Sequence, residues 1–186
     1  KLHTVGVAVP GAEIEIVDNS GNKVPAGEIG EITCKSIARF SRYYGNEEST
    51  EKSFKRGYFY TGDMGYIDEE NYLVFCSRKK EIIITGGTNI YPADVEAVLN
   101  QHPLVKEVSV VGVEDEKLGE KVVAFVILKE EGALTSRELQ RHCMNNLADY
   151  QKPLSYIFVR DFPRTPLGKI LKRKLVDQFK EDSIRL

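Results

Sequence analysis

Three short clusters along this 186-residue chain combine charged side chains with glycine. The first is Tyr60–Gly65 (YTGDMG), in which Asp63 stands between two glycines. A carboxylate presented by such a strand–turn segment can accept hydrogen bonds from paired hydroxyl groups, such as those of a ribose. The same pattern also suits a turn aspartate that bonds to its own loop. Both interpretations stay open on this cluster alone.

The second cluster extends from Arg78 to Asn89 and contains Gly86 and Gly87 after a β-branched run. A diglycine lets a ligand approach the backbone closely, and the N–H groups it exposes can meet a phosphate. The alternative is an ordinary hairpin turn. The pattern GxxxxGK[ST], which marks a phosphate-binding P-loop, does not occur in the sequence.

The third cluster is Pro163–Ile170 (PRTPLGKI), where two prolines stiffen a loop and Gly168 precedes Lys169. A lysine held in this way offers a mobile positive charge to a phosphate or a carboxylate. The alternative is a solvated lysine at the start of a basic helix, because the basic run Lys172–Lys174 follows.

The elements that must position these clusters fall into two regions. The first region reads as short strands and one helix: strands at 12–17, 28–35, 58–61 and 72–76, and a helix from 46 to about 54. The second region mixes both types: strands at 81–85, 105–113, 121–129 and 155–160, and helices beginning near 92, 135 and 168. The sequence therefore predicts an α+β fold with a boundary near Ser77, which gives regions 1–77 and 78–186.

Composition argues against several classes of protein. The 26 Lys and Arg nearly balance the 28 Asp and Glu, so the net charge of −2 gives no reason to expect a nucleic-acid partner. No apolar run approaches the roughly 18–20 residues that a membrane helix needs. Three His without metal-ligand spacing argue against a metal site.

The odd set Cys34, Cys76 and Cys143 favours free thiols in a reducing compartment such as the cytoplasm. The start, Lys1–Thr4, has neither a signal-peptide layout nor an initiator Met, which favours a fragment or a processed product.

In their order and spacing, the three clusters resemble the adenylate-forming (AMP-binding) superfamily, and the resemblance covers essentially the whole chain. Residues 9–32 are similar to the segment before the family's ribose motif, and Tyr60–Asp63 to that motif itself. Residues 77–96 are similar to the hinge and linker motif, and Pro163–Ile170 to the catalytic-lysine motif. The resemblance implies that residues 1–77 are the β-rich end of a large N-terminal domain and that residues 78–186 are a small lid domain. Two positions depart from the family pattern: Ser77 replaces a common Gly, and Tyr60 replaces a frequent basic residue or His.

Members of this family join a carboxylic acid to the α-phosphate of ATP and then transfer the acyl group to a thiol, usually that of CoA. The first step brings two anions together and needs charge neutralisation. The resemblance implies that Lys169 is catalytic and bridges the acyl carboxylate and the nucleotide. It also implies that Asp63 accepts hydrogen bonds from the ribose hydroxyls and that Arg78 contacts the ribose.

The resemblance implies two further roles in the lid. Lys80 would be the hinge about which the lid swings. Gly86, Gly87 and Thr88 would line the path of CoA in the second conformation, where a side chain at Gly87 would obstruct pantetheine.

The expected partners are ATP, a carboxylic acid and CoA, with Mg²⁺ accompanying ATP and bound by ligands outside this chain. The family's phosphate loop and acyl pocket would precede Lys1, so the chain alone is not expected to complete adenylation.

The string Ile84–Pro92 (ITGGTNIYP) favours a fatty-acyl-CoA ligase over an aryl- or succinylbenzoyl-CoA ligase. A non-catalytic binding module with the lid fold is the alternative of another class. An oligomer is compatible with the sequence.

Overall fold

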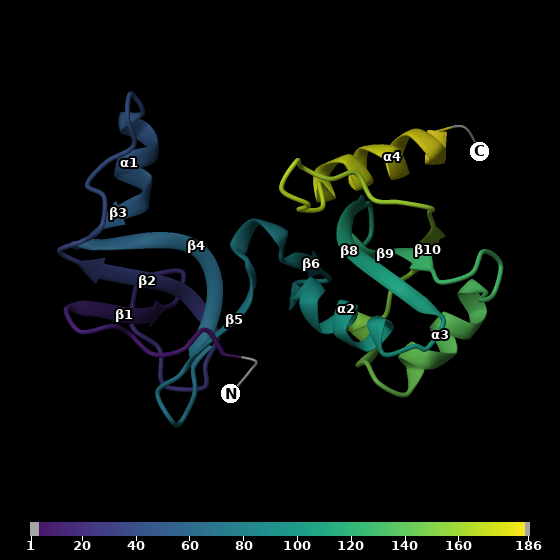
Figure 1. Ribbon diagram of the computed structural model, residues 1–186, viewed down its shortest axis with the longest axis horizontal. Coiled ribbons are helices and arrows are strands. Elements are labelled where there is room, and N and C mark those ends of the chain that lie inside the picture. The colour runs from purple at the N-terminus through teal and green to yellow at the C-terminus, as the bar shows by residue number, and fades with distance from the viewer. Residues whose placement is uncertain (1–3, 185–186) are drawn as a thin grey trace. The chain divides into compact units, whose positions relative to one another are not determined.

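The computed structural model describes residues 4–184, which form two compact units (Figure 1). The division falls between Lys80 and Glu81, slightly after the predicted boundary at Ser77. Each unit has its own five-stranded sheet, and helices pack beside strands. The predicted α+β class is confirmed.

The sheet of the first unit is antiparallel throughout, with strand order β1-β2-β4-β3 and β5 paired with β4. Its strands are β1 (Ala12–Val17), β2 (Gly30–Ser36), β3 (Phe54–Lys55), β4 (Tyr58–Ile67) and β5 (Leu73–Arg78). Strand β4 is the long central member, which pairs with β2, β3 and β5 in turn along its length. Because β4 continues to Ile67, the predicted strand at 58–61 was too short.

The first unit has a small apolar core and one helix, α1 (Glu47–Ser53). Ile16, Ile32 and Leu73 form the buried centre of its sheet. Asn46, where the predicted helix begins, caps α1: its side chain accepts a hydrogen bond of 2.9 Å from the Ser49 N–H.

The sheet of the second unit has strand order β10-β9-β6-β7, with β8 paired with β9. Its strands are β6 (Ile83–Thr85), β7 (Thr88–Ile90), β8 (Val105–Asp115), β9 (Gly119–Leu128) and β10 (Ser155–Phe158). Strand β10 lies parallel to β9, and the other pairs are antiparallel.

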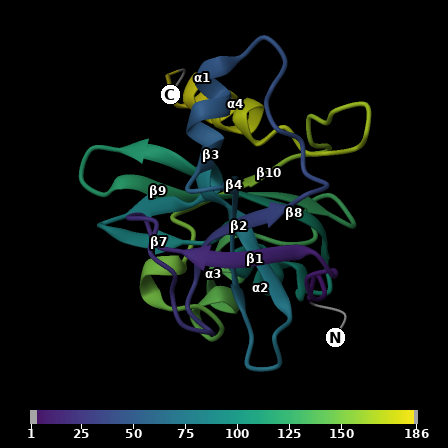
Figure 2. The same ribbon diagram turned by 90° about the vertical axis from the view of Figure 1, so that its left-hand side faces the viewer.

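The helices α2 (Pro92–Asn100), α3 (Ser136–Met144) and α4 (Lys172–Ile184) cover both faces of this second sheet. Figures 1 and 2 show α2 and α3 on one side of the sheet and α4 on the other. Alternate residues of β9 supply the two cores: Val122, Ala124 and Val126 on the α2–α3 side, and Val123, Phe125 and Ile127 on the α4 side. Burial on both faces explains why this strand reads as a continuous apolar run.

Two predicted elements begin elsewhere than expected. The helix expected near Gly168 begins at Lys172, because Gly168 has a φ of 84° and the preceding segment folds back as a hairpin. The strand expected at 81–85 begins at Ile83, because Lys79–Glu81 forms a 3₁₀ helix. None of the helices between residues 4 and 184 has the length and apolar character that crossing a membrane demands.

Candidate functional site

Asp63 lies in a bulge of β4 and not in the turn that the sequence suggested. On β2, Glu31 pairs with Met64 of β4, whereas Thr33 pairs with Tyr60, so β4 carries extra residues opposite Ile32. Gly62 accommodates the bulge with a φ of 73°, which few other residues tolerate. Bulges of this kind redirect side chains and occur frequently beside active sites.

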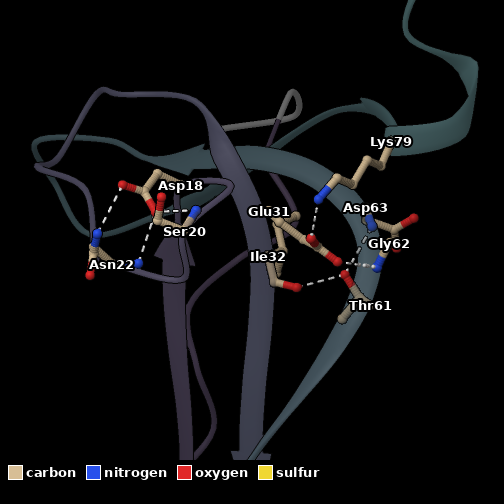
Figure 3. A network of polar contacts seen from close by, with 9 residues as sticks. All are labelled: Asp18, Ser20, Asn22, Glu31, Ile32, Thr61, Gly62, Asp63 and Lys79. Atoms are coloured by element: carbon tan, nitrogen blue, oxygen red, sulfur yellow. Dashed lines mark hydrogen bonds and ion pairs between the residues drawn. The ribbon is translucent and has the colours of Figure 1, made fainter. Parts of the chain in front are cut away.

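Hydrogen bonds from β2 hold the bulge in shape (Figure 3). The Thr61 hydroxyl donates to the Ile32 carbonyl at 2.7 Å and accepts from the Asp63 N–H at 3.0 Å. The Gly62 N–H donates to Glu31 Oε1 at 3.2 Å. Lys79 Nζ lies 2.7 Å from Glu31 Oε2, which pairs the charge of this buried carboxylate. The bulge therefore has a defined conformation before any ligand binds.

The bulge places the Asp63 carboxylate beside the guanidinium of Arg78. The two residues are direct cross-strand partners of β4 and β5, and Arg78 Nε lies 2.7 Å from Asp63 Oδ1. Oδ1 is nevertheless buried without an aligned hydrogen-bond donor among the described residues, so the contact is an attraction of charges and not a directed hydrogen bond. A buried acceptor without a donor is costly.

Lys80 is the last residue of the first unit and the middle residue of the 3₁₀ helix Lys79–Glu81. Short 3₁₀ segments often mark hinges, because their hydrogen bonds are weaker than those of an α-helix. The Lys80 side chain is exposed. The boundary between the two units thus coincides with the predicted hinge residue.

Gly86 and Gly87 form the two-residue turn of the β6–β7 hairpin, between the paired residues Thr85 and Thr88. Their φ angles of 56° and 82° suit a type I′ turn, which explains the diglycine structurally. The Gly86 N–H donates to the Leu118 carbonyl at 2.8 Å. A Cβ added at either glycine would meet no atom within 4 Å, so the turn backbone faces open space. Geometry alone accounts for the glycines, and the open space leaves room for a ligand.

Lys169 stands on a short hairpin before α4, and this loop, residues 163–171, is called the lysine loop below. The Thr165 N–H donates to the Lys169 carbonyl at 2.8 Å, and the Lys169 N–H donates to the Thr165 hydroxyl at 3.2 Å. Lys169 is exposed, and none of the ion pairs among the described residues of the second unit involves its Nζ. A fixed backbone thus carries an unpaired ammonium group.

The structure brings two of the predicted residues into direct contact, Asp63 and Arg78, in the first unit. Lys169 and the diglycine turn belong to separate loops of the second unit. Sequence reasoning missed Glu31 and Lys79, which support the bulge. The only local signal was that Glu31, a charged residue, lies inside the apolar strand β2. The role of Glu31 depends on Lys79, which is far away in the sequence.

Comparisons with known proteins agree with the three clusters. The model of the AMP-binding enzyme C-terminal domain family matches residues 94–169. The chain is 38% identical over 184 residues to a fatty acid–[acyl-carrier-protein] ligase of Streptomyces coeruleorubidus, covering 99% of this chain and 36% of that protein. It is 38% identical over 183 residues to a long-chain-fatty-acid–CoA ligase of Bacillus subtilis, covering 98% of this chain and 33% of that protein.

A solved structure agrees as well. The o-succinylbenzoate CoA synthetase of Bacillus subtilis, in complex with its acyl-adenylate intermediate, superposes with a TM-score of 0.87 at 36% identity. That match covers 94% of this chain and 36% of the other. The chain spans about a third of the length of the curated relatives it matches.

The fold and these matches agree on the class of domain: residues 94–169 match the AMP-binding enzyme C-terminal domain family. The resemblance inferred from the sequence clusters is confirmed, because the chain is a relative of the adenylate-forming ligases over nearly all of its length.

Proposed function

We propose that this chain is the C-terminal part of an AMP-forming acyl-CoA synthetase. In the first half-reaction a carboxylate attacks the α-phosphate of ATP, which forms an acyl-adenylate and releases pyrophosphate. In the second, a thiol attacks the acyl carbonyl, which forms a thioester and releases AMP. The remaining two thirds of such an enzyme would supply the phosphate loop and the acyl pocket, so the activity belongs to the longer protein.

The observation that carries this proposal is the pair formed by Asp63 and Arg78 on the bulge of β4. The Asp63 carboxylate faces the Arg78 guanidinium, and its side chain is 28% exposed, so part of the carboxylate stays open to accept a hydrogen bond from a ribose hydroxyl. Arg78 Nε faces this carboxylate at 2.7 Å, which leaves the other N–H groups of the guanidinium for the nucleotide. This pair would hold the AMP portion in both half-reactions.

Lys169 would act in the first half-reaction only. Attack of a carboxylate on a phosphate brings two anions together, and a lysine ammonium between them lowers that electrostatic cost. Lys169 is exposed, and its Nζ has no ion-pair partner among the described residues of the second unit, so it is available for this purpose. A lysine also suits a charge that must be withdrawn later, because its flexible stem carries a compact charge.

The second half-reaction would use a different orientation of the lid. Rotation about Lys80, in the 3₁₀ helix at the unit boundary, would bring the β6–β7 turn to the thiol. Gly86, Gly87 and Thr88 would then line the path of CoA, where the open space beside the glycines admits a narrow chain. A carrier-protein thiol is the other candidate, since one of the relatives is a ligase of that kind.

The acid is proposed to be a fatty acid, because relatives at 38% identity carry that specificity in their names. An aryl or succinylbenzoyl acid is the second candidate, which the likeness to the o-succinylbenzoate enzyme favours. Mg²⁺ would arrive bound to ATP, because it usually binds through phosphate oxygens, water and one or two carboxylates. Cys34, Cys76 and Cys143 are not joined in disulfides among the described residues, which supports a cytoplasmic location.

The test uses carboxylate-dependent pyrophosphate exchange in the full-length protein. Lys169→Ala should lose this exchange and keep thioester formation from a supplied acyl-adenylate. Lys174→Ala, which removes an exposed lysine from the basic run that follows Lys169, is the matched control. Equal losses in both half-reactions for Lys169→Ala would remove the role assigned to Lys169. If the unmutated full-length protein binds ATP but shows no pyrophosphate exchange, it is a non-catalytic binding module instead.

A further inference from the structure

The lysine loop is not held by apolar packing at its tip. Leu167, at the tip, is 97% exposed, and Pro166, Gly168 and Lys169 are exposed as well. Only Ile170, toward the end of the loop, packs against the core that underlies α4. The position of the Lys169 ammonium must therefore depend on contacts at the two ends of the loop.

Arg164 fastens the start of the lysine loop to β8. Its Nη2 lies 2.5 Å from Glu107 Oε2, and its Nη1 donates to the Gly168 carbonyl at 3.2 Å. The guanidinium also lies over the Phe162 ring, 5.8 Å from the ring centre. One planar group thus connects a strand of the sheet to the residue directly before Lys169.

Lys172 fastens the end of the lysine loop to α2. Its Nζ donates to Glu96 Oε1 at 2.8 Å and lies 3.7 Å from Glu81 Oε2. Glu96 Oε1 also accepts from the Val110 N–H at 2.8 Å, which fixes that carboxylate on β8. Glu81 is the first residue after Lys80, so the same ammonium connects the lysine loop to the hinge side of the second unit.

These ion pairs differ from ordinary surface pairs in their burial. Arg164 and Glu107 have side chains 32% and 35% exposed, and Lys172 and Glu96 have side chains 23% and 22% exposed. The side chains of Arg160 and Glu131, a surface pair in the same unit, are 87% and 78% exposed. Partly buried, hydrogen-bonded charges hold a geometry, whereas exposed pairs contribute little.

We propose that Arg164 and Lys172 are positioning residues for Lys169: together they hold both ends of the lysine loop and fix where the ammonium meets the reacting carboxylate and phosphate. The inference rests on the proposed function, because it assigns these residues to the adenylation half-reaction. Neither side chain touches the reactants. Their effect is geometric, and displacement of a reacting group by about 1 Å can cost up to about 100-fold in rate.

The experiment replaces each residue by methionine in the full-length protein, which keeps an apolar stem and removes the charge. For Arg164→Met and Lys172→Met we expect kcat of pyrophosphate exchange to fall by about 10- to 100-fold. Thioester formation from supplied acyl-adenylate should stay within about twofold, because Lys169 takes no part in it. A general loss of structure would lower both activities together.

Three further variants complete the design. Lys180 lies on α4, as Lys172 does, and pairs with Glu114 of β8, away from the lysine loop. Lys180→Met breaks this ion pair and should leave both half-reactions unchanged. Arg164→Lys should recover part of the exchange, because lysine can reach one of the two acceptors but cannot span both. If Arg164→Met fails to fold, Glu107→Gln removes the same ion pair with a smaller change.

Lys169→Ala, measured in parallel, separates the two proposals. If Lys169→Ala loses exchange while Arg164→Met, Glu107→Gln and Lys172→Met keep it, the positioning role is wrong and the proposed function stands. If Lys169→Ala itself keeps exchange, the role of the lysine fails and the positioning role falls with it. Equal losses in both half-reactions for the methionine variants would also overturn the positioning role.

Discussion

At the scale of single residues, the two glycines beside Asp63 serve different physical needs. Gly62 provides a backbone conformation with a φ of 73°, and a Cβ there would meet no atom within 4 Å. Gly65 provides space, because a Cβ there would lie 2.3 Å from the Val74 carbonyl oxygen and 2.9 Å from Ile32 Cδ1. Both positions are glycine in the sequence. Only the pairing of β4 with its neighbouring strands shows that one glycine is needed for its backbone conformation and the other for space.

Gly65→Ala should therefore destabilise the first unit more than Gly62→Ala does. The Gly65 Cβ must push a backbone oxygen of β5, and overpacking of this kind costs about 1–3 kcal/mol, with the larger values where backbone has to move. Alanine at Gly62 meets no neighbouring atom, so its only cost is the free energy of holding a left-handed backbone conformation, about 1 kcal/mol. Urea unfolding followed by tyrosine fluorescence measures both variants. Equal midpoints for the two variants would contradict the assignment.

The residues that carry charge at the site show what sequence reasoning could reach. Asp63, Arg78 and Lys169 were identifiable because each stands in a local string with glycine or a basic neighbour. Glu31 was not, because its burial depends on Lys79, which lies 48 residues further along the chain. A charged residue in a strand is read as exposed unless its partner is known.

At the scale of elements, prediction succeeded where the pattern was local. The capping box of Thr135 and Glu138 is present at the start of α3, and Pro92 occupies the first turn of α2. It failed at the lysine loop, where a basic run suggested a helix from Gly168. The hairpin there is closed by Thr165 and by Arg164, which reaches Glu107 on another strand. That long-range contact has no local signature.

The β6–β7 turn gives a prediction at this scale for the full-length protein. Gly87→Leu should spare pyrophosphate exchange and impair thioester formation, because its side chain would project into the proposed path of CoA. Gly132→Leu is a matched control in the second unit: Gly132 has a φ of 77°, near the 82° of Gly87, and a Cβ at either meets no atom within 4 Å. Both variants carry the same backbone strain. Equal thioester formation in the two variants would exclude the CoA role of Gly87.

The junction of α2 and α3 should make stability depend on pH. His102, in the turn after α2, stacks edge-on against His142 of α3 with ring centres 5.3 Å apart. Burial lowers the pKa of His102 below its usual value, the charge of His142 lowers it further, and the charge of Glu138 opposes them. Its Nδ1 also accepts the Leu104 N–H at 3.3 Å, which requires an unprotonated nitrogen.

Because the folded pKa of His102 lies below the unfolded value of about 6.5, the unfolded state binds the proton more readily. Stability is then complete above about pH 6.5 and is lost as the pH falls through that value toward the folded pKa. His102→Asn keeps an acceptor for Leu104 and removes the titration. Urea midpoints measured at pH 7 and pH 5 should fall less in this variant than in the wild type. An identical fall would show that His102 contributes nothing to the pH dependence.

At the scale of the whole molecule, the chain is built as two independent cores joined by one short 3₁₀ segment. The first unit encloses Ile16, Ile32 and Leu73, and the second encloses two larger clusters on either side of β9. No strand of one sheet belongs to the other among the described residues. This division places Asp63 and Arg78 in one unit and Lys169 in the other. Under the proposed function, rotation at the junction would change which loop of the second unit meets the substrate.

The junction itself gives the last prediction. Lys80→Pro fixes φ at residue 80 and restricts Lys79, so it narrows the set of conformations that the hinge can adopt. Under the proposed function, one orientation of the lid would serve adenylation and the other would serve thioester formation, and a restricted hinge would not disfavour both to the same degree. The two half-reactions of the full-length protein, measured separately, should therefore fall by unequal factors. Lys80→Ala, which removes the same side chain and leaves the backbone free, separates the loss of the ammonium from the loss of motion. Equal losses in Lys80→Pro, or an identical pattern in Lys80→Ala, would mean that Lys80 does not act as a hinge.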